Sequence, residues 1–103
     1  MIHRFAIAEL FGRFLADGDR GNEFRFRHVE PIWPQYERIE FDFAGVANLT
    51  DSFANGCFGN MAAEHAGDFR SKVRVLNCDP VVKSILAAAV ARGLAEGSGS
   101  CVG

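Results

Sequence analysis

Two strand-like segments, each followed by a helix-like segment, fill the second half of the chain and constrain its fold more than any other feature. Residues 38–43, RIEFDF, alternate apolar and charged side chains, which predicts a strand with one buried face. Residues 72–77, KVRVLN, alternate in the same way around Val73 and Val75. Two such strands separated by a helix lie parallel in one sheet, joined by a right-handed crossover, with helices covering the sheet.

The helix between these strands is predicted to run from Asp51 to about Ala66, and its two halves differ in composition. Thr50, Asp51 and Ser52 all favour the N-cap position, although one cap is enough. At 100° per residue the apolar half consists of Phe53, Ala54, Cys57, Phe58, Met61 and His65. The opposite half is small and uncharged, and it consists of Ser52, Asn55, Gly56, Gly59, Asn60 and Ala63.

The smallness of that second half needs a reason, because each internal glycine costs a helix about 1 kcal/mol relative to alanine. Solvated helix faces usually carry Glu, Lys and Arg instead. We expect another backbone to approach this face closely, either from a partner protein or from a loop or the sheet of the same chain.

The two ends of the chain are predicted from their turn and capping residues. Asp79 followed by Pro80 starts a last helix, and Gly93 ends it. Near the N-terminus, residues 3–11 alternate partly, Gly12 follows, and RFL comes next, which predicts an N-terminal hairpin that turns at Gly12.

The segment from Glu23 to Tyr36 is ambiguous. FRFR has the period of a strand, whereas the apolar residues from Val29 to Tyr36 have helical spacing. Asn22 could cap a helix here, and Pro31 would interrupt or kink it. We predict a helix.

Together these elements predict an α/β fold: a small mixed sheet, with an N-terminal hairpin and parallel strands, packed by about three helices. The chain has 103 residues, which suits one domain. We place that domain at residues 1–94 and expect the Gly/Ser-rich residues 95–103 to be a flexible tail.

Composition excludes several functional classes. The 11 Lys and Arg residues are interspersed with 13 Asp and Glu residues, so no basic stripe is available for nucleic acid or for an anionic membrane. Cys57, Cys78 and Cys101 lie far apart and form no CxxC pair, which argues against a disulfide framework or a metal site. No signal peptide or transmembrane segment is evident, and we expect a cytoplasmic protein.

Catalytic signatures are also missing from the sequence. No phosphate-binding loop, dinucleotide fingerprint, nucleophile elbow or HExxH motif occurs, so we expect neither catalysis nor a cofactor. His65 and Cys57 fall on the apolar half of their helix, where a paired histidine and a buried thiol are the simplest interpretation.

Ser52 is the strongest candidate for a functional residue, and two interpretations stand. It could cap its helix, which is worth about 1 kcal/mol. Alternatively, it could accept a phosphate, because a helix N-terminus tolerates negative charge. A phosphate beside the small face would disrupt whatever docks there.

The run IEFDFAGVANLTDSFA, followed by a helix, a strand and a helix ending in Gly-Leu, resembles the STAS domain of anti-sigma factor antagonists. More specifically, GRFLADGDRGNEFR and FDFAGVANLTDSFANGCFGNM resemble the STAS-like group of uncharacterised bacterial proteins. The resemblance spans roughly residues 5 to 94.

This resemblance assigns roles to three residues. Asp42 matches the Asp of the family's strand, Asp51 matches the Asp before the phosphoacceptor, and Ser52 matches the acceptor. In the antagonists a GHKL-type kinase, which is also the anti-sigma partner, phosphorylates this serine and thereby releases the complex. Phe53 and Ala54 stand where the antagonists have Ser-Gly.

We therefore predict a non-catalytic signalling module that binds a protein partner, with phosphorylation at Ser52 as its switch. The predicted interaction face consists of Ser52, Asn55, Gly56, Gly59 and Asn60. One alternative is a small anion- or nucleotide-binding domain or enzyme that uses the helix N-terminus at Asp51 and Ser52. Another is a structural subunit of an oligomer.

Overall fold

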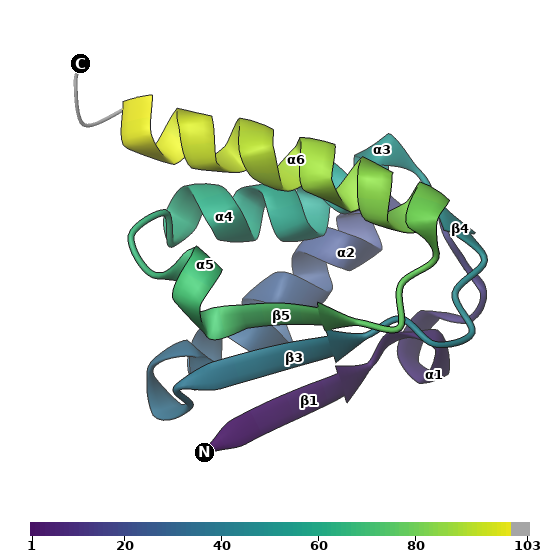
Figure 1. Ribbon diagram of the computed structural model, residues 1–103, viewed down its shortest axis with the longest axis horizontal. Coiled ribbons are helices and arrows are strands. Elements are labelled where there is room, and N and C mark those ends of the chain that lie inside the picture. Colours follow the sequence, from purple (N-terminus) through teal and green to yellow (C-terminus); the bar gives the residue numbers. More distant parts are fainter. Residues whose placement is uncertain (100–103) are drawn as a thin grey trace.

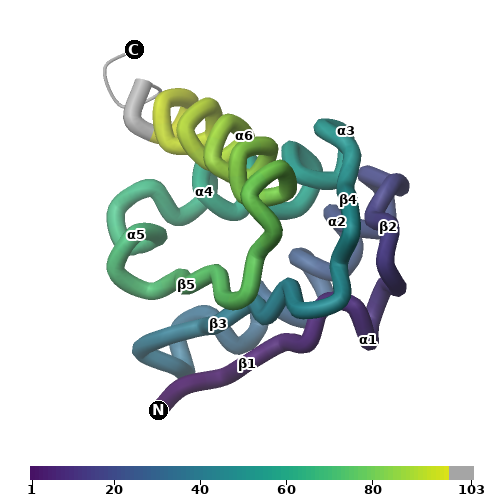
Figure 2. The backbone as a smooth tube through the Cα atoms, turned by 45° about the vertical axis from the view of Figure 1, so that its right-hand side comes forward, coloured from purple at the N-terminus to yellow at the C-terminus, as the bar shows by residue number. Residues whose placement is uncertain are grey.

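A parallel three-stranded sheet, with helices packed over one of its faces, forms the body of the protein (Figure 1). The computed structural model describes residues 1–99. The sheet has the order β1-β3-β5 and consists of β1 (Ile2–Ala6), β3 (Arg38–Asp42) and β5 (Val73–Leu76). Beside it, β2 (Phe14–Leu15) and β4 (Asn48–Leu49) form a short parallel pair, seen side by side in Figure 2.

The helical segments are as follows. The first part of the chain contains α1 (Ile7–Phe11), α2 (Gly18–Phe24), a π-helical turn (Arg25–Val29) and a 3-10 helix (Glu30–Gln35). The second part contains α3 (Asp51–Ala54), a π-helical turn (Asn55–Gly59), α4 (Asn60–Glu64), α5 (Phe69–Lys72) and α6 (Pro80–Gly99). The segments from α3 to α4 follow one another without a break, and we call them the 51–64 helix.

The alternation in the two predicted strands decides which face of the sheet is covered. Ile39 and Phe41 are fully buried beneath the helices. On the other face Arg4, Glu40 and Arg74 lie in register across the three strands, and Arg4 pairs with Glu40 at 3.0 Å. A row of charges suits water, so this face stays uncovered and the fold has two layers.

The core lies between the sheet and the helices. Its largest fully buried side chains are Phe41, Phe43, Phe53, Phe58, Ile7, Leu15, Ile39, Met61, Val29, Val82 and Cys57. Phe58 of the 51–64 helix meets Phe41 of β3 edge to face, with ring centroids 5.0 Å apart. The predicted apolar half of this helix is therefore confirmed as its buried side, and His65 is half-buried at its end.

The predicted N-terminal hairpin is wrong. Residues 7–11 form a helix, and β1 pairs in parallel with β3. Phe5 stacks on Phe41 at 5.5 Å, a contact that an alternation pattern cannot distinguish from hairpin pairing. Gly12 does turn the chain at φ +85°, but it does so as the C-cap of α1, where its N–H donates to the Ala8 carbonyl.

The helix predicted over 23–36 is confirmed, with different limits. It starts at Gly18, because the Asp17 carboxylate caps it by accepting from the Asp19 amide at 2.9 Å. Pro31 does not stop it, because the chain has by then tightened into a 3-10 helix whose first turn tolerates proline. The helical path ends at Gln35, and Tyr36 is extended.

The last helix does not end at Gly93 as predicted but continues to Gly99. Gly93 faces the 51–64 helix, where an added Cβ would overlap the Gly59 carbonyl oxygen and lie 3.1 Å from Ala62 Cβ. This glycine therefore permits a close approach of two helices and does not terminate one. The first five residues of the predicted tail, 95–99, are helical, and residues 100–103, with Cys101, lie outside the described part of the chain.

Candidate functional site

Thr50 is the N-cap of the 51–64 helix, for which the sequence offers Thr50, Asp51 and Ser52. The Phe53 amide donates to Thr50 Oγ1 at 3.2 Å, and Thr50 Oγ1 in turn donates to the Ala16 carbonyl at 3.0 Å. The β2–β4 pair brings Ala16 into reach, because the Thr50 amide also donates to the Leu15 carbonyl at 2.9 Å. Ser52 is consequently not needed to start the helix.

Ser52 is the second residue of α3, in the first turn of the 51–64 helix, and it is exposed. Among residues 1–99 its hydroxyl has no hydrogen-bond partner. The neighbour it packs against is Gly18 of α2, where an added Cβ would overlap Ser52 Oγ and lie 2.8 Å from the Ser52 carbonyl oxygen. Asp17 and Asp19 flank Gly18, and all of these side chains belong to exposed or half-buried positions.

Asp42 has a structural role at the carboxyl end of β3. Its Oδ1 accepts from the Ala44 amide at 2.9 Å and from Asn77 Nδ2 at 3.1 Å. These two hydrogen bonds, that from Ala44 first, hold the pKa of Asp42 below its ordinary value. They also tie the loop after β3 to Asn77, which follows β5 and has a left-handed φ of 53°. Within residues 1–99 no hydrogen bond or ion pair connects Asp42 with Ser52.

Replacement of Asp42 by asparagine should lower stability at pH 7 by less than about 1 kcal/mol, since the lost interactions are charge-assisted but exposed. A depressed pKa stabilises the fold above the unfolded-state pKa and loses this contribution as pH falls through the folded value. Urea unfolding should therefore separate wild type from variant at pH 7, and the two curves should converge below about pH 4. A difference that stays constant down to pH 2.5 would contradict this role of the carboxylate.

The predicted interaction face is partly covered by the chain itself, which is a correction for its two glycines. A Cβ on Gly56 would lie 2.7 Å from the Gly18 carbonyl oxygen, so α2 crosses this position. Gly59 is buried against α6, next to Gly93 and the Ala89 carbonyl. A π turn winds more residues per turn than the 3.6 assumed in the projection, which shifts the faces of the residues after it. The close approach expected here is made by two helices of the same molecule.

The two asparagines of the predicted face remain accessible, and each has a partner. Arg92 of α6 donates to Asn55 Oδ1 at 3.1 Å. Asn60 Nδ2 donates to the Gly56 carbonyl at 3.0 Å and to Asn22 Oδ1 of α2 at 3.3 Å. A polar groove of about 260 Å³ remains above Gly59, between the 51–64 helix and α6.

Neither described cysteine is an activated thiol. Burial raises the pKa of Cys57 far above its ordinary value, as suits a core residue. Burial, together with the adjacent Asp79 carboxylate, also raises the pKa of Cys78. The start of α6 therefore does not activate this thiol.

A partly buried ionic cluster was not predicted from the sequence. Arg25 is only 8% exposed, and its Nη1 donates to Glu30 Oε2 at 3.1 Å. His65 Nε2 meets the same carboxylate, at 2.9 Å from Oε1 and 3.0 Å from Oε2. The His65 ring stacks on Trp33 with centroids 3.9 Å apart, and Trp33 Nε1 donates to Asp68 at 3.0 Å. Arg25 and Glu30 are five positions apart, but Glu30 and His65, like Trp33 and Asp68, are 35 positions apart, so no local pattern reveals the whole cluster.

The described part of the chain lacks both a metal-binding cluster and a membrane-spanning helix. Residues 1–99 contain no group of three or more His, Cys, Asp or Glu residues placed to hold a metal ion. No helix in this part of the chain is both long and apolar enough to cross a membrane.

The model of the family described as STAS-like domain of unknown function (DUF4325) matches residues 20–83, which is more than half of the chain. The chain belongs to this family. The STAS-like assignment and the α/β fold class are thereby confirmed, and the match includes Asp42, Asp51 and Ser52. No curated protein and no solved structure matches the chain.

Proposed function

We propose that this STAS-like domain is a non-catalytic regulatory module, which binds a partner protein through the Ser52 end of the 51–64 helix and loses that partner when Ser52 is phosphorylated. The observation that supports this proposal is the state of Ser52 itself. Its hydroxyl is exposed and has no hydrogen-bond partner within residues 1–99, and Thr50 performs the capping that would otherwise explain it.

A phosphate on Ser52 would act mainly by repulsion. It carries nearly two negative charges and would stand beside Asp51, with Asp17 and Asp19 on either side of the neighbouring Gly18. The contact with Gly18 leaves no room for added bulk on that side. Modification would therefore push the start of α2 away from the 51–64 helix as well as alter the charge of the docking surface.

The proposed partner is a GHKL-type kinase or related ATPase, as the resemblance to anti-sigma factor antagonists implies. The docking surface is centred on exposed Ser52 and includes half-buried Asn55 and exposed Asn60. Gly56 and Gly59 are no longer part of it, since α2 and α6 cover them.

The alternative of an anion site at the same helix start has less support. The Phe53 amide is already bound by Thr50, so it is not free for a ligand. Asp51 lies in the first turn and would repel a free anion that has no covalent attachment.

Binding to a GHKL-type ATPase encoded beside the protein's gene tests the proposal directly. We expect Ser52→Ala to bind as wild type does and Ser52→Asp to bind at least tenfold more weakly in calorimetric titration. Ser84→Asp is the matched control, because Ser84 is also exposed but lies on α6, and this variant should bind normally. Equal affinities of Ser52→Asp and wild type would exclude the switch. Intact-mass analysis of protein from the native host should detect an added phosphate, and peptide mapping should assign it to Ser52.

A further inference from the structure

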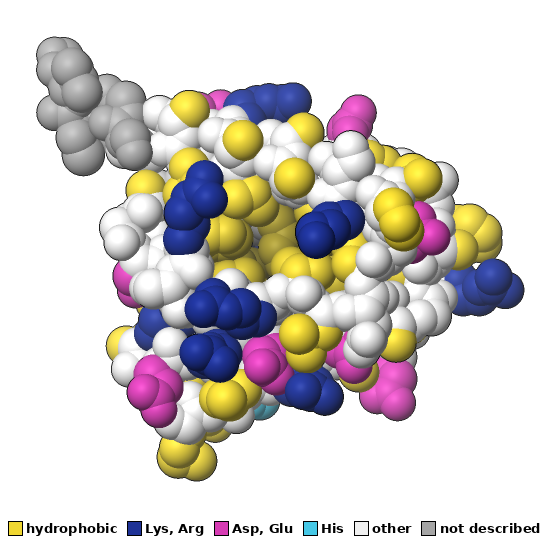
Figure 3. Space-filling view, viewed as in Figure 1, with side chains coloured by type: hydrophobic (Ala, Val, Ile, Leu, Met, Phe, Trp, Pro, Cys, Tyr) yellow, Lys and Arg dark blue, Asp and Glu magenta, His cyan; other side chains and the backbone are white. Residues whose placement is uncertain are grey.

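An apolar groove of about 300 Å³ lies between the edge of the sheet and α6. Figure 3 shows it as a hollow with an apolar floor on the face turned to the viewer. The floor includes Phe58 of the 51–64 helix, Val73 and Val75 of β5, and Leu86 and Val90 of α6. Val75 is 38% exposed, so the floor reaches solvent along β5.

The strand beside this groove has one free edge. Within the described residues β5 pairs only with β3. The Leu76 carbonyl accepts from the Phe43 amide at 2.8 Å and so faces β3. Because backbone groups alternate in direction along a strand, those of Val75 point away from β3. The N–H and C=O of Val73 also point away from β3, but both already have partners. The Val73 amide donates to the Phe69 carbonyl, and the Val73 carbonyl accepts from Arg74.

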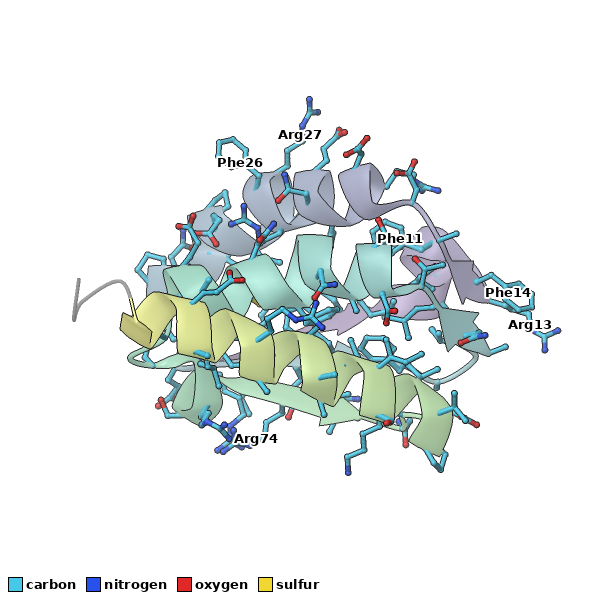
Figure 4. The ribbon with its side chains drawn as sticks, turned by 90° about the horizontal axis from the view of Figure 1, so that it is seen from above. Phe11, Arg13, Phe14, Phe26, Arg27 and Arg74 are labelled. Carbon is cyan, nitrogen blue, oxygen red and sulfur yellow. The ribbon has the colours of Figure 1, made fainter. Side chains whose placement is uncertain are left out.

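The rim of the groove is positively charged. Arg70 stands at the α5 side and Lys83 at the α6 side, and none of the residues that line the groove is acidic. The Arg74 side chain starts on the opposite face of β5 and reaches its free edge, where Nη1 donates to the Arg70 carbonyl at 2.9 Å and to the Val73 carbonyl at 3.0 Å. Figure 4 shows this side chain projecting beyond the edge of α6. A second copy of this chain paired edge to edge would bring these cations together, which like-charge repulsion disfavours. The charge instead suits a segment that carries carboxylates.

We propose that this groove docks an extended, acidic segment of another protein, which adds a strand to the free edge of β5. The backbone of the segment pairs with the N–H and C=O of Val75. Its apolar side chains, at every second position, fill the hollow over Val73 and Leu86. Its carboxylates lie against Arg70, Lys83 and Arg74. The surface is separate from Ser52, so this inference stands or falls independently of the phosphoswitch.

Selection of a phage-displayed library of random dodecapeptides on the full chain tests the proposal. We expect the enriched peptides to alternate apolar residues with Asp or Glu and to bind with dissociation constants on the order of 10 µM, because small interfaces bind weakly. Lys83→Glu should weaken the best peptide at least tenfold. Val75→Pro should abolish its binding, since proline removes the N–H at the free edge.

Arg13→Glu is the matched control, because Arg13 is an exposed arginine at the other end of the molecule (Figure 4), and it should leave peptide affinity unchanged. Circular dichroism checks that each variant is folded, and Lys83→Glu decides the question if Val75→Pro does not fold. Three results would overturn the proposal: no enriched peptide, enriched peptides without carboxylates, or binding that Lys83→Glu leaves unchanged. A dimer of the wild type that Lys83→Glu alters would also overturn it, because the occupant would then be a second copy.

Discussion

Replacement of Gly93 by valine should lower the free energy of unfolding by about 3 kcal/mol or more, because even one added carbon does not fit there. A Cβ at this position would overlap the Gly59 carbonyl oxygen and lie 3.0 Å from the Gly59 carbonyl carbon. Both obstacles are backbone atoms, which cannot rotate away as a side chain can. Helix propensity by itself slightly favours valine over glycine, so the loss must come from separation of α6 and the 51–64 helix.

Urea unfolding measures this loss, and Gly67→Val is the matched control. No atom lies within 4 Å of a Cβ on Gly67, so that variant should stay within about 0.5 kcal/mol of wild type. If Gly93→Val is as stable as the control, α6 does not pack on the 51–64 helix in the way described.

Replacement of Glu30 by alanine should lower the free energy of unfolding by about 2–3 kcal/mol. The Glu30 carboxylate is the counter-ion of Arg25, whose side chain is 10% exposed, and it also binds His65. Its removal leaves the guanidinium with Asn22 Oδ1 as its remaining partner within residues 1–99. Removal of one partner of a buried ion pair usually costs about 3–5 kcal/mol, and we expect a smaller loss because the Glu30 side chain is 24% exposed.

The free energy of unfolding of Glu30→Ala, measured by heat or urea, is compared with that of the control variant Glu23→Ala. Glu23 also pairs with an arginine, Arg27, at 3.3 Å, but both side chains are more than half exposed. An exposed pair contributes little, so this control should change stability by less than about 0.5 kcal/mol. The emission of Trp33, which stacks on His65, should change in Glu30→Ala alone. Similar losses in the two variants would contradict the structural role of the cluster.

Prediction from the sequence succeeded where the signal lies in neighbouring residues. The alternation of Ile39 and Phe41 and the apolar half of the 51–64 helix both match the buried positions. Asp79 likewise accepts a hydrogen bond from the Val81 amide at the start of α6, as its position before Pro80 indicates. Side-chain periodicity and capping act over a few residues, so a local pattern is sufficient to find them.

Prediction failed where the same residue type serves two local structures. Gly93 was expected to end a helix, because glycine commonly follows the last turn, but it sits within α6 to allow contact with Gly59. Residues 7–11 alternate enough to suggest a strand and instead form α1. Neither outcome can be read from the residues themselves, because each depends on a segment distant in the chain.

At the candidate site, too, some features follow from the sequence and others depend on tertiary packing. The sequence by itself determined that Ser52 lies at the start of a helix with a small, uncharged side, and which residues compose that side. Only the tertiary structure decided that α2 and α6 cover Gly56 and Gly59, while Ser52 stays exposed and Thr50 forms the cap. The physical reason is that a glycine in the sequence indicates a close approach of another backbone but does not identify that backbone. Which segment approaches depends on packing between residues more than thirty positions apart.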